Sequence, residues 1–193
     1  MNVLAILLAA GSATRFGSDK LLHSLPHEVP IAVQSARHLK AVFSGRVLAV
    51  VRPDSVRLKE FLEKENCQVV VCENAAEGMG ASLACAVRAA SDADAFVVAL
   101  ADMPFIRSST IAAVRDALAG GAPLVAPYFR ARRGHPVGIS AKFRSELEAL
   151  RGDEGARKVV AANEAGLVKI PVGDPGVLRD IDTPQDLVAR VIV

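Results

Sequence analysis

The amino-acid sequence predicts an α/β protein built on a single three-layer, doubly wound and mostly parallel sheet. Short aliphatic runs alternate with segments whose apolar residues recur every three or four positions. The runs are typical of strands buried on both faces, and the periodic segments of helices that pack on them. Apolar residues make up 51% of the chain, but Trp is absent and Tyr occurs once, so aliphatic side chains must build the core. Strands and helices that alternate in this way indicate a parallel sheet covered on both faces.

The first half of the chain supplies four strands and three helices. Each strand is an aliphatic run that stops at a polar or turn-forming residue, and these runs are Val3–Ala10, Val47–Val51, Gln68–Cys72 and Ala95–Ala101. Each helix carries an apolar stripe or a run of small residues. Gly45 ends the first helix and Pro53 opens the second. The helices are expected at Pro30–Phe43, Pro53–Leu62 and Ala81–Ala90.

The second half continues the alternation. Ser108 or Ser109 can cap a helix that runs through Leu118, and the Gly120–Gly121 pair ends that helix. Strands are then expected at Leu124–Pro127, Val137–Ile139 and Leu167–Val172, with a basic turn at Arg130–Gly134. Further helices are expected near Phe143–Leu150, near Gly155–Glu164 and from Thr183 onward. Because no linker, repeat or low-complexity tract interrupts the pattern, residues 1–193 are expected to form one domain.

Composition and charge exclude several classes of partner. The net charge is +2 and no run of five basic residues occurs, so neither a nucleic-acid surface nor a membrane surface is predicted. The apolar runs are far shorter than the ~20 residues that span a bilayer. No Lys or Arg precedes the first run, as one would in a signal peptide. Cys67, Cys72 and Cys85 lack close metal-ligand spacing and suit buried thiols in a reducing compartment. We therefore expect a cytoplasmic protein.

The strongest chemical signal follows the first strand. Residues 8–20 read Leu-Ala-Ala-Gly-Ser-Ala-Thr-Arg-Phe-Gly-Ser-Asp-Lys, and such small residues let backbone N–H groups approach a phosphate chain. Arg15 can pair with phosphate oxygens as a fork and Lys20 as a point charge, which would stabilise a leaving pyrophosphate. The candidate nucleotide-binding residues here are Leu8, Ala9, Ala10, Gly11 and Ser12.

Two familiar phosphate-binding motifs do not fit this loop. A P-loop requires Gly-Lys-Ser/Thr, and the dinucleotide fingerprint requires Gly-x-Gly-x-x-Gly, whereas Gly11 and Gly17 stand alone. The missing fingerprint argues against a nicotinamide-dependent oxidoreductase. An ordinary strand-to-helix turn with solvated charges is the simplest alternative. A basic loop at the end of the first strand nevertheless lies where α/β sheets bind ligands.

Two carboxylates are considered as metal ligands. Asp102 ends an apolar strand, where a charge is costly unless a cation, a cap or water meets it. Mg²⁺ is commonly held by one or two carboxylates with phosphate oxygens and water, so Asp102 is a predicted metal ligand, and a cap of the following turn is the alternative. Asp182 stands just before Pro184, and from these residues alone a helix cap is the favoured interpretation.

Taken together, these segments resemble the MobA-like nucleotidyltransferases. The pattern Leu-Ala-Ala-Gly-x-x-x-Arg-x-Gly-x-x-Lys of residues 8–20 resembles the family signature, and the likeness continues at intervals to Leu187. Within the family the sequence is most similar to the molybdenum cofactor cytidylyltransferases. The resemblance implies a fold like that of the nucleotide-diphospho-sugar transferases, with Mg²⁺ or Mn²⁺ as the cofactor.

The resemblance also implies roles in nucleotide and metal binding. Gly78, Gly80 and Ser82 match a Gly-x-Gly-x-Ser-Leu element that implies contact with the base or ribose, although Ser82 could instead cap a helix. Ala10 stands where guanylyl-transferring relatives commonly have a second Gly, which favours CTP over GTP. The Asp-x-Asp-Thr-Pro-x-Asp-Leu element of residues 180–187 implies that Asp182 is the second metal ligand, beside Asp102.

On the acceptor side, the resemblance covers two short elements. The Arg-Gly-His-Pro piece at residues 133–136 and the segment 152–157 imply an acceptor site made by Arg133, His135, Asp153 and Arg157. Solvated loop arginines and a helix cap by Asp153 are the alternatives. The family usually has a Gly in the turn after Lys20, and the segment His23–Pro30 has none. That departure leaves room for an altered acceptor.

The reaction implied is the transfer of CMP from CTP to molybdenum-loaded molybdopterin with release of pyrophosphate. A molybdenum hydroxylase that receives the product is the implied transient partner. A guanylyltransferase, or a transferase that uses another phosphorylated acceptor, is the alternative within the same chemistry. A delivery chaperone that binds the nucleotide or finished cofactor without catalysis is the alternative from another class.

Overall fold

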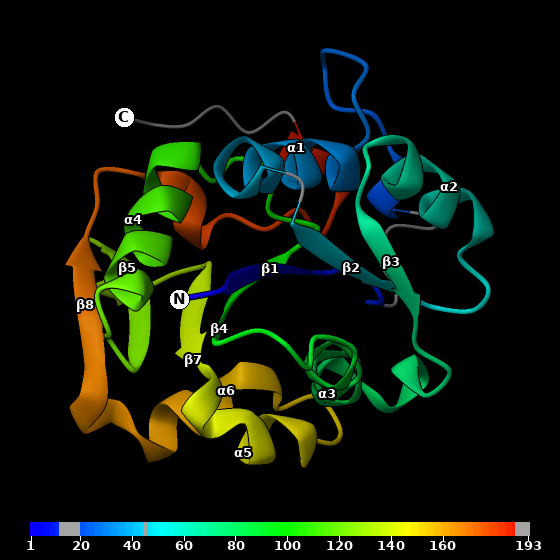
Figure 1. Ribbon diagram of the computed structural model, residues 1–193. Coiled ribbons are helices and arrows are strands. Elements are labelled where there is room, and N and C mark those ends of the chain that lie inside the picture. The colour runs from blue at the N-terminus through cyan, green and yellow to red at the C-terminus, as the bar shows by residue number, and fades with distance from the viewer. Residues whose placement is uncertain (12–19, 45, 188–193) are drawn as a thin grey trace.

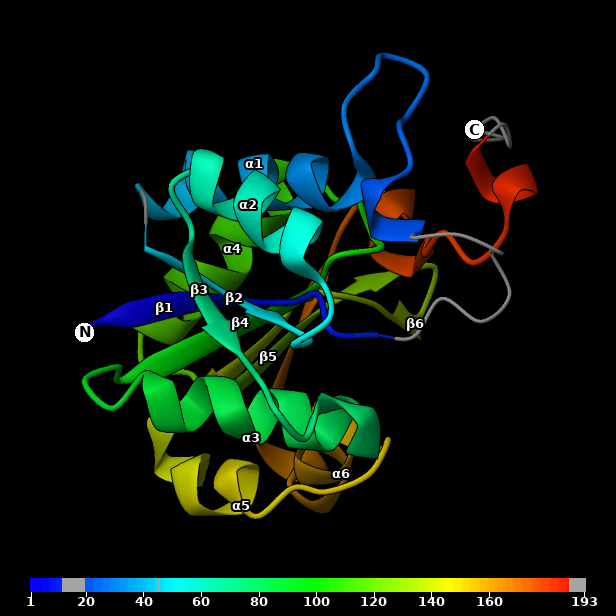
Figure 2. The same cartoon turned by 90° about the vertical axis from the view of Figure 1, so that its right-hand side faces the viewer.

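The structure is a computed structural model that describes residues 1–11, 20–44 and 46–187. It has three layers, with a central sheet between two layers of helices (Figure 1). Helices α1 (Ile31–Phe43), α2 (Val56–Lys64) and α4 (Ser108–Ala119) cover one face (Figure 2). Helices α3 (Met79–Ala89), α5 (Arg144–Glu148) and α6 (Gly155–Ala162) cover the other. The predicted three-layer α/β architecture is therefore confirmed.

The strand order brings together the loops that follow two central parallel strands, at the carboxyl ends of those strands. The strands are β1 (Val3–Leu8), β2 (Val47–Val51), β3 (Gln68–Val71), β4 (Ala95–Leu100), β5 (Leu124–Phe129), β6 (Arg132–Arg133), β7 (Val137–Ser140) and β8 (Leu167–Pro171). They form the order β3-β2-β1-β4-β7-β5-β6, with β8 paired to β5. Strands β1 to β4 are mutually parallel, as are β5 and β8, whereas β7 is antiparallel to both β4 and β5. The order reverses between β1 and β4, and such a reversal opens a crevice at the carboxyl ends of the two strands.

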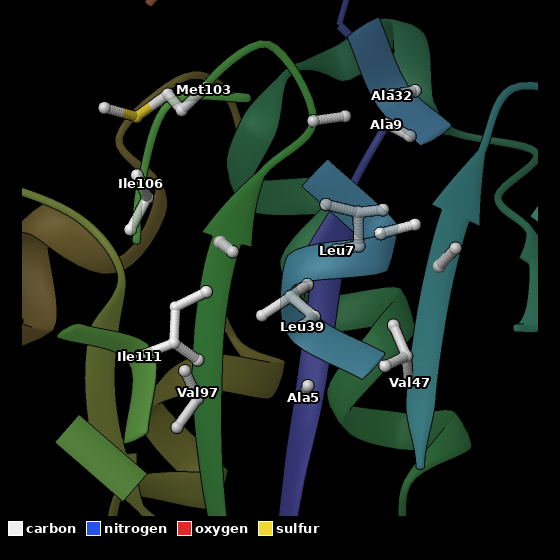
Figure 3. Close-up of a cluster of buried hydrophobic side chains, with 14 of the residues drawn as sticks. Ala5, Leu7, Ala9, Ala32, Leu39, Val47, Val97, Met103, Ile106 and Ile111 are labelled. Carbon is white, nitrogen blue, oxygen red and sulfur yellow. The ribbon is translucent and has the colours of Figure 1, made fainter. Parts of the chain in front are cut away.

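The side chains of strand β1 point alternately to the two faces of the sheet and therefore contribute to two separate parts of the core. Ala5, Leu7 and Ala9 point toward α1 and pack with Leu39 and Val97 (Figure 3). The alternate positions, Leu4, Ile6, Leu8 and Ala10, belong to the cluster on the α3 side. Burying each large aliphatic side chain contributes about 1.5–3 kcal/mol. The same alternation fixes which residues after β1 can face the α3 side of the crevice.

One predicted turn is present in the structure, and one predicted helix differs. The predicted turn after β5 is a two-residue hairpin, in which Arg130 and Ala131 have φ of 48° and 62° and connect β5 to β6. Such turns usually contain Asn or Gly. The sequence of this turn contains neither and so lacks the usual hairpin signal. The helix expected from Thr183 is a 3-10 turn over Pro184–Leu187, and residues 188–193 lie outside the described part. Among the described helices, none is long and apolar enough to cross a membrane.

The segment between residues 23 and 30 closes on itself without a glycine. Ser24 and Pro30 form an isolated β-bridge, and the backbone N–H of Leu25 donates to the Val29 carbonyl at 2.9 Å. Within this loop Glu28 has φ of 65°, a left-handed conformation that is costly for any residue with a side chain. The chain therefore closes the loop with a strained, exposed glutamate.

Replacing this glutamate with glycine is expected to stabilise the protein. Glu28→Gly should raise the free energy of unfolding by about 0.5–1 kcal/mol, because the relieved strain exceeds the extra chain entropy of glycine. Urea unfolding measures the difference. Glu28→Ala keeps the strained backbone and serves as the control, which should match the parent protein. A Glu28→Gly protein no more stable than the control would contradict the assigned strain.

Candidate functional site

The carboxyl ends of the parallel strands surround a cavity of about 450 Å³, which we call the first cavity. It lies at the crevice between β1 and β4 and extends to the start of α3. Many of the predicted site residues line it: Leu8, Ala10, Gly11, Lys20, Gly78, Ser82, Asp102, Asp153 and Asp182. The structure thus brings the phosphate-loop, base or ribose, and carboxylate candidates to one place.

Lys20 joins the two candidate carboxylates in this cavity. Its Nζ donates to Oδ2 of Asp102 at 2.9 Å and to Oδ1 of Asp182 at 3.2 Å. Lys20 opens a 3-10 turn over Lys20–Leu22, and Asp102 follows β4. The backbone N–H of Ile181 donates to the Asp102 carbonyl at 2.9 Å, which fastens the segment carrying Asp182 to the end of β4. A tertiary hydrogen bond therefore assembles this trio.

The two carboxylates keep Lys20 charged. Burial lowers the pKa of Lys20, but the hydrogen bonds and charges of Asp102 and Asp182 outweigh it and the net pKa is raised. Lys20 is therefore charged at neutral pH. Burial raises the pKa of nearby Asp180, and the charges of Asp182 and Asp102 raise it further. The other oxygen of Asp102, Oδ1, is buried and has no hydrogen-bond partner among the described residues.

The turn after Asp182 is capped by a different carboxylate. Oδ2 of Asp186 accepts from the backbone N–H groups of Thr183 at 2.7 Å and Asp182 at 3.0 Å, and from the Thr183 hydroxyl at 2.9 Å. These hydrogen bonds, led by the one from the Thr183 hydroxyl, lower the pKa of Asp186. The cap interpretation of Asp182 is therefore wrong in the described part of the chain. Its carboxylate points to Lys20 instead.

A second cavity of about 280 Å³ adjoins the first. All four predicted acceptor residues line it: Arg133, His135, Asp153 and Arg157. They come from β6, the β6–β7 loop, the loop before α6 and α6 itself. The two cavities share Leu8, Met79, Leu100 and Asp153. Asp153 does not cap α6, whose N-cap residue is Glu154 without a side-chain cap, so its carboxylate remains available to a ligand.

His135 presents an uncharged ring to the second cavity. Burial lowers its pKa, although the charge of Asp102 opposes this, and Arg133 lowers the pKa further. Nδ1 of the ring is buried and has no partner among the described residues. The backbone N–H of His135 donates to the Val177 carbonyl at 2.9 Å, which fixes the residue in place. An uncharged imidazole nitrogen can form a hydrogen bond with a polar group in the cavity.

Of the other predicted site residues, two are not described by the structure, and two line neither cavity. Ser12 and Arg15 lie outside the described residues. Ala9 faces α1 because β1 alternates (Figure 3), and Gly80 is buried under the loop at residues 151–152. Ser82 lines the first cavity, but its hydroxyl donates to the Gly78 carbonyl at 3.3 Å rather than capping a free N–H.

Arg52 and Met79 are among the cavity residues that were not predicted from the sequence. Arg52 follows β2 at the same sheet edge and lines the first cavity, and its guanidinium bonds Asp54 at 2.7 and 3.0 Å. A basic residue directly after a buried strand was the available signal. Met79 is 42% exposed and lies between the two cavities. An apolar residue at a helix start carries no comparable sequence signal.

Comparison with known proteins identifies the family. The MobA-like NTP transferase domain matches residues 5–167. The chain belongs to this family. As a MobA-like nucleotidyltransferase it is similar to the purine catabolism protein PucB of Bacillus subtilis (strain 168), with 30% identity over 205 residues that cover 98% of this chain and 97% of PucB. It is also similar to the nicotine blue oxidoreductase of Paenarthrobacter nicotinovorans, with 28% identity over 195 residues, 96% of this chain and 94% of that protein.

A solved structure confirms the fold of this MobA-like protein. Rv0371c from Mycobacterium tuberculosis H37Rv superposes with a TM-score of 0.83 and 22% sequence identity. The match covers 98% of this chain and 100% of that one. The expected fold, like that of the nucleotide-diphospho-sugar transferases, is therefore confirmed.

Proposed function

We propose that this MobA-like enzyme transfers CMP from CTP to the terminal phosphate of molybdenum-loaded molybdopterin and releases pyrophosphate. The observation that carries the proposal is the trio of Lys20, Asp102 and Asp182, which lies in a cavity that adjoins an arginine-lined one. A triphosphate can bind beside the trio while a phosphorylated acceptor binds beside Arg133 and Arg157. The two reactants would then meet at the shared wall.

The residues of the first cavity fit a divalent cation. The carboxylates of Asp102 and Asp182 both contact Lys20 and so lie close together. Oδ1 of Asp102 is buried without a partner among the described residues. Oxygen donors of this kind suit Mg²⁺ or Mn²⁺. When bound there, such a cation would offset negative charge on the α-phosphoryl oxygens. Asp102 and Asp182 are the proposed ligands.

The remaining residues would bind and orient the two substrates. An acceptor phosphate oxygen bonds to the α-phosphorus while the bond to the β-phosphate oxygen breaks, and the electron pair leaves with pyrophosphate. Lys20, together with Arg15, would stabilise that leaving group. Arg133 and Arg157 would hold the acceptor phosphate. Because positioning and electrostatics carry this chemistry, no protein nucleophile or base is required.

The rest of the candidate site would provide specificity. Backbone groups near Leu8, Ala10 and Gly11, with Ser82, would hold the nucleotide at the first cavity. His135 and Asp153 offer hydrogen bonds to polar groups of the acceptor at the second cavity. We also propose a cytoplasmic setting and a transient contact with the molybdenum hydroxylase that receives the product.

The nucleotide preference tests this proposal directly. Pyrophosphate release should be fastest with CTP among the four nucleoside triphosphates and should require molybdenum-loaded molybdopterin. The reason is Ala10, which stands where guanylyl-transferring relatives commonly have a second glycine. A clear preference for GTP would overturn the cytidylyl assignment and keep the reaction class. Tight nucleotide binding without pyrophosphate release would support the delivery chaperone instead.

A parallel assay separates the transferase from a redox enzyme. One relative is named an oxidoreductase, whereas this sequence lacks the dinucleotide fingerprint after its first strand. Incubation with NADH or NADPH and a dye acceptor should therefore show no oxidation of the nicotinamide. Turnover in this assay, with no release of pyrophosphate, would replace the transferase proposal.

A further inference from the structure

The start of α3 packs against the loop that precedes α6. The backbone N–H of Gly80 donates to the Gly152 carbonyl at 2.7 Å. This N–H is one of the free donors at a helix N-terminus, which would otherwise be available to a ligand. A Cβ on Gly80 would lie 2.8 Å from the Arg151 carbonyl oxygen and 2.9 Å from that of Gly152. The missing side chain of Gly80 therefore makes room for the loop at residues 151–153.

Gly78 makes room for the same loop. It has φ of 124°, a conformation that other residues rarely adopt, and an added Cβ would collide with the Asp153 carboxylate and the Gly152 carbonyl. The sequence pattern of two glycines was expected to allow a nucleotide to approach the backbone. In the structure, both glycines allow the approach of a protein loop.

This loop carries residues into the second cavity. Asp153 lines both cavities, and Arg157 follows on the first turn of α6. Met79, between the two glycines, lies beside Gly155 at the start of α6, where an added Cβ would be 3.0 Å from its Sδ. Residues 78–80 therefore lie against both the 151–153 loop and the first residue of α6. Gly80 itself lines neither cavity and is buried.

We propose that Gly80 is a positioning residue for the acceptor half of the site, acting through the 151–153 loop and not by contact with the nucleotide. A side chain at Gly80 pushes the loop outward and moves Asp153 and the first turn of α6. The inference rests on the proposed function, since it assigns the second cavity to the acceptor. It predicts that a change at the start of α3 alters acceptor binding much more than CTP binding.

The test compares Gly80→Ala with the parent protein in two binding measurements. The acceptor KM, from pyrophosphate release at saturating CTP, should rise at least about tenfold, because small misplacements of positioning groups have large effects. The Kd for CTP, from calorimetry with Mg²⁺ present, should change much less, because only Asp153 of the displaced segment lines the first cavity. Gly120→Ala at the end of α4 is the control, because a Cβ there would lie 3.4 Å from its nearest backbone oxygens, an ordinary contact distance. It should change neither the acceptor KM nor the CTP Kd.

A second variant reaches the loop from its other side. Gly152 has φ of 62°, and a Cβ there meets nothing within 4 Å, so Gly152→Ala strains the loop without crowding α3. It should reproduce the rise in acceptor KM with a much smaller change in the CTP Kd, even where Gly80→Ala is too unstable to assay. A fall in CTP affinity as large as the loss in acceptor binding, in either variant, would overturn the proposal.

Hydrogen exchange separates this inference from the proposed function. Amides of residues 152–157 should exchange faster in Gly80→Ala than in the parent, while those of β1 should not change. If the parent protein shows no turnover with the molybdopterin acceptor, the proposed function fails but this readout still reports on the loop. Unchanged exchange at residues 152–157 in a folded Gly80→Ala protein would refute the positioning role.

Discussion

Asp102→Asn is expected to reduce turnover by about 10³-fold, the upper range for loss of one electrostatic stabiliser. The substitution nearly keeps the shape of the side chain, and its amide oxygen can still accept from Lys20. It removes the charge from the buried Oδ1, the oxygen that has no partner among the described residues. Thermal unfolding should differ little from the parent protein, because Lys20 retains Asp182 as a partner at 3.2 Å.

Asp182→Asn is the matched comparison for this experiment. The Asp182 side chain is 51% exposed, against 25% for Asp102, and its contact with Lys20 is longer. We therefore expect a smaller loss of activity that added Mg²⁺ partly restores. Activity against Mg²⁺ concentration for both variants measures the difference. If Asp182→Asn turns over as fast as the parent protein at every Mg²⁺ concentration, Asp102 must hold the cation with substrate oxygens and water. Full activity in Asp102→Asn would refute the metal site.

The capping contacts allow a control for stability. Since Asp186 caps the turn at Thr183, Asp182→Ala should lose activity without the cost of a lost cap. Asp186→Ala should lose about 1 kcal/mol of stability, the usual value for a cap. The reverse order of stabilities would restore Asp182 as the cap.

The sequence was sufficient for the layers of the fold and for residues that directly follow a buried strand. Continuous aliphatic runs have few alternatives to a central parallel strand, and the carboxyl ends of such strands meet at one edge. Asp102 and the residues after β1 could therefore be placed together from the strand pattern alone. Arg52 obeys the same rule and could have been found. The basic turn after β5 was predicted as well, but its two-residue form was not, because its positive φ values occur without Asn or Gly.

The remaining site residues depend on tertiary contacts that local patterns do not specify. The segment around Asp182 reads as a helix start, and tertiary contacts such as the hydrogen bond from Ile181 to the Asp102 carbonyl and the one from Lys20 to Asp182 bring it to the first cavity. Likewise, the glycines at 78 and 80 indicate a close approach of backbone, but the pattern does not say what approaches. The loop that fills the space is about 70 residues away in the chain.

Lys20→Met is expected to have two opposite effects. Turnover should fall by about 10²-fold or more, because the charge that would stabilise leaving pyrophosphate is lost. Binding of Mn²⁺ without nucleotide should become stronger, because the ammonium group no longer neutralises Asp102 and Asp182 at 2.9 and 3.2 Å. Pyrophosphate release measures the first effect, and the electron paramagnetic resonance signal of free Mn²⁺ measures the second.

Both effects should be independent of pH across the neutral range. The pKa of Lys20 is raised above 10.5 in the folded protein, so its contribution to stability is fully present below that value and is lost only as the pH rises through the folded pKa. Lys20→Arg keeps the charge and should keep Mn²⁺ binding near that of the parent. Asp182→Asn added to Lys20→Met should reverse the gain in Mn²⁺ affinity. Normal turnover by a folded Lys20→Met protein would refute the catalytic role, and an unchanged Mn²⁺ affinity would contradict a cation site beside Asp102 and Asp182.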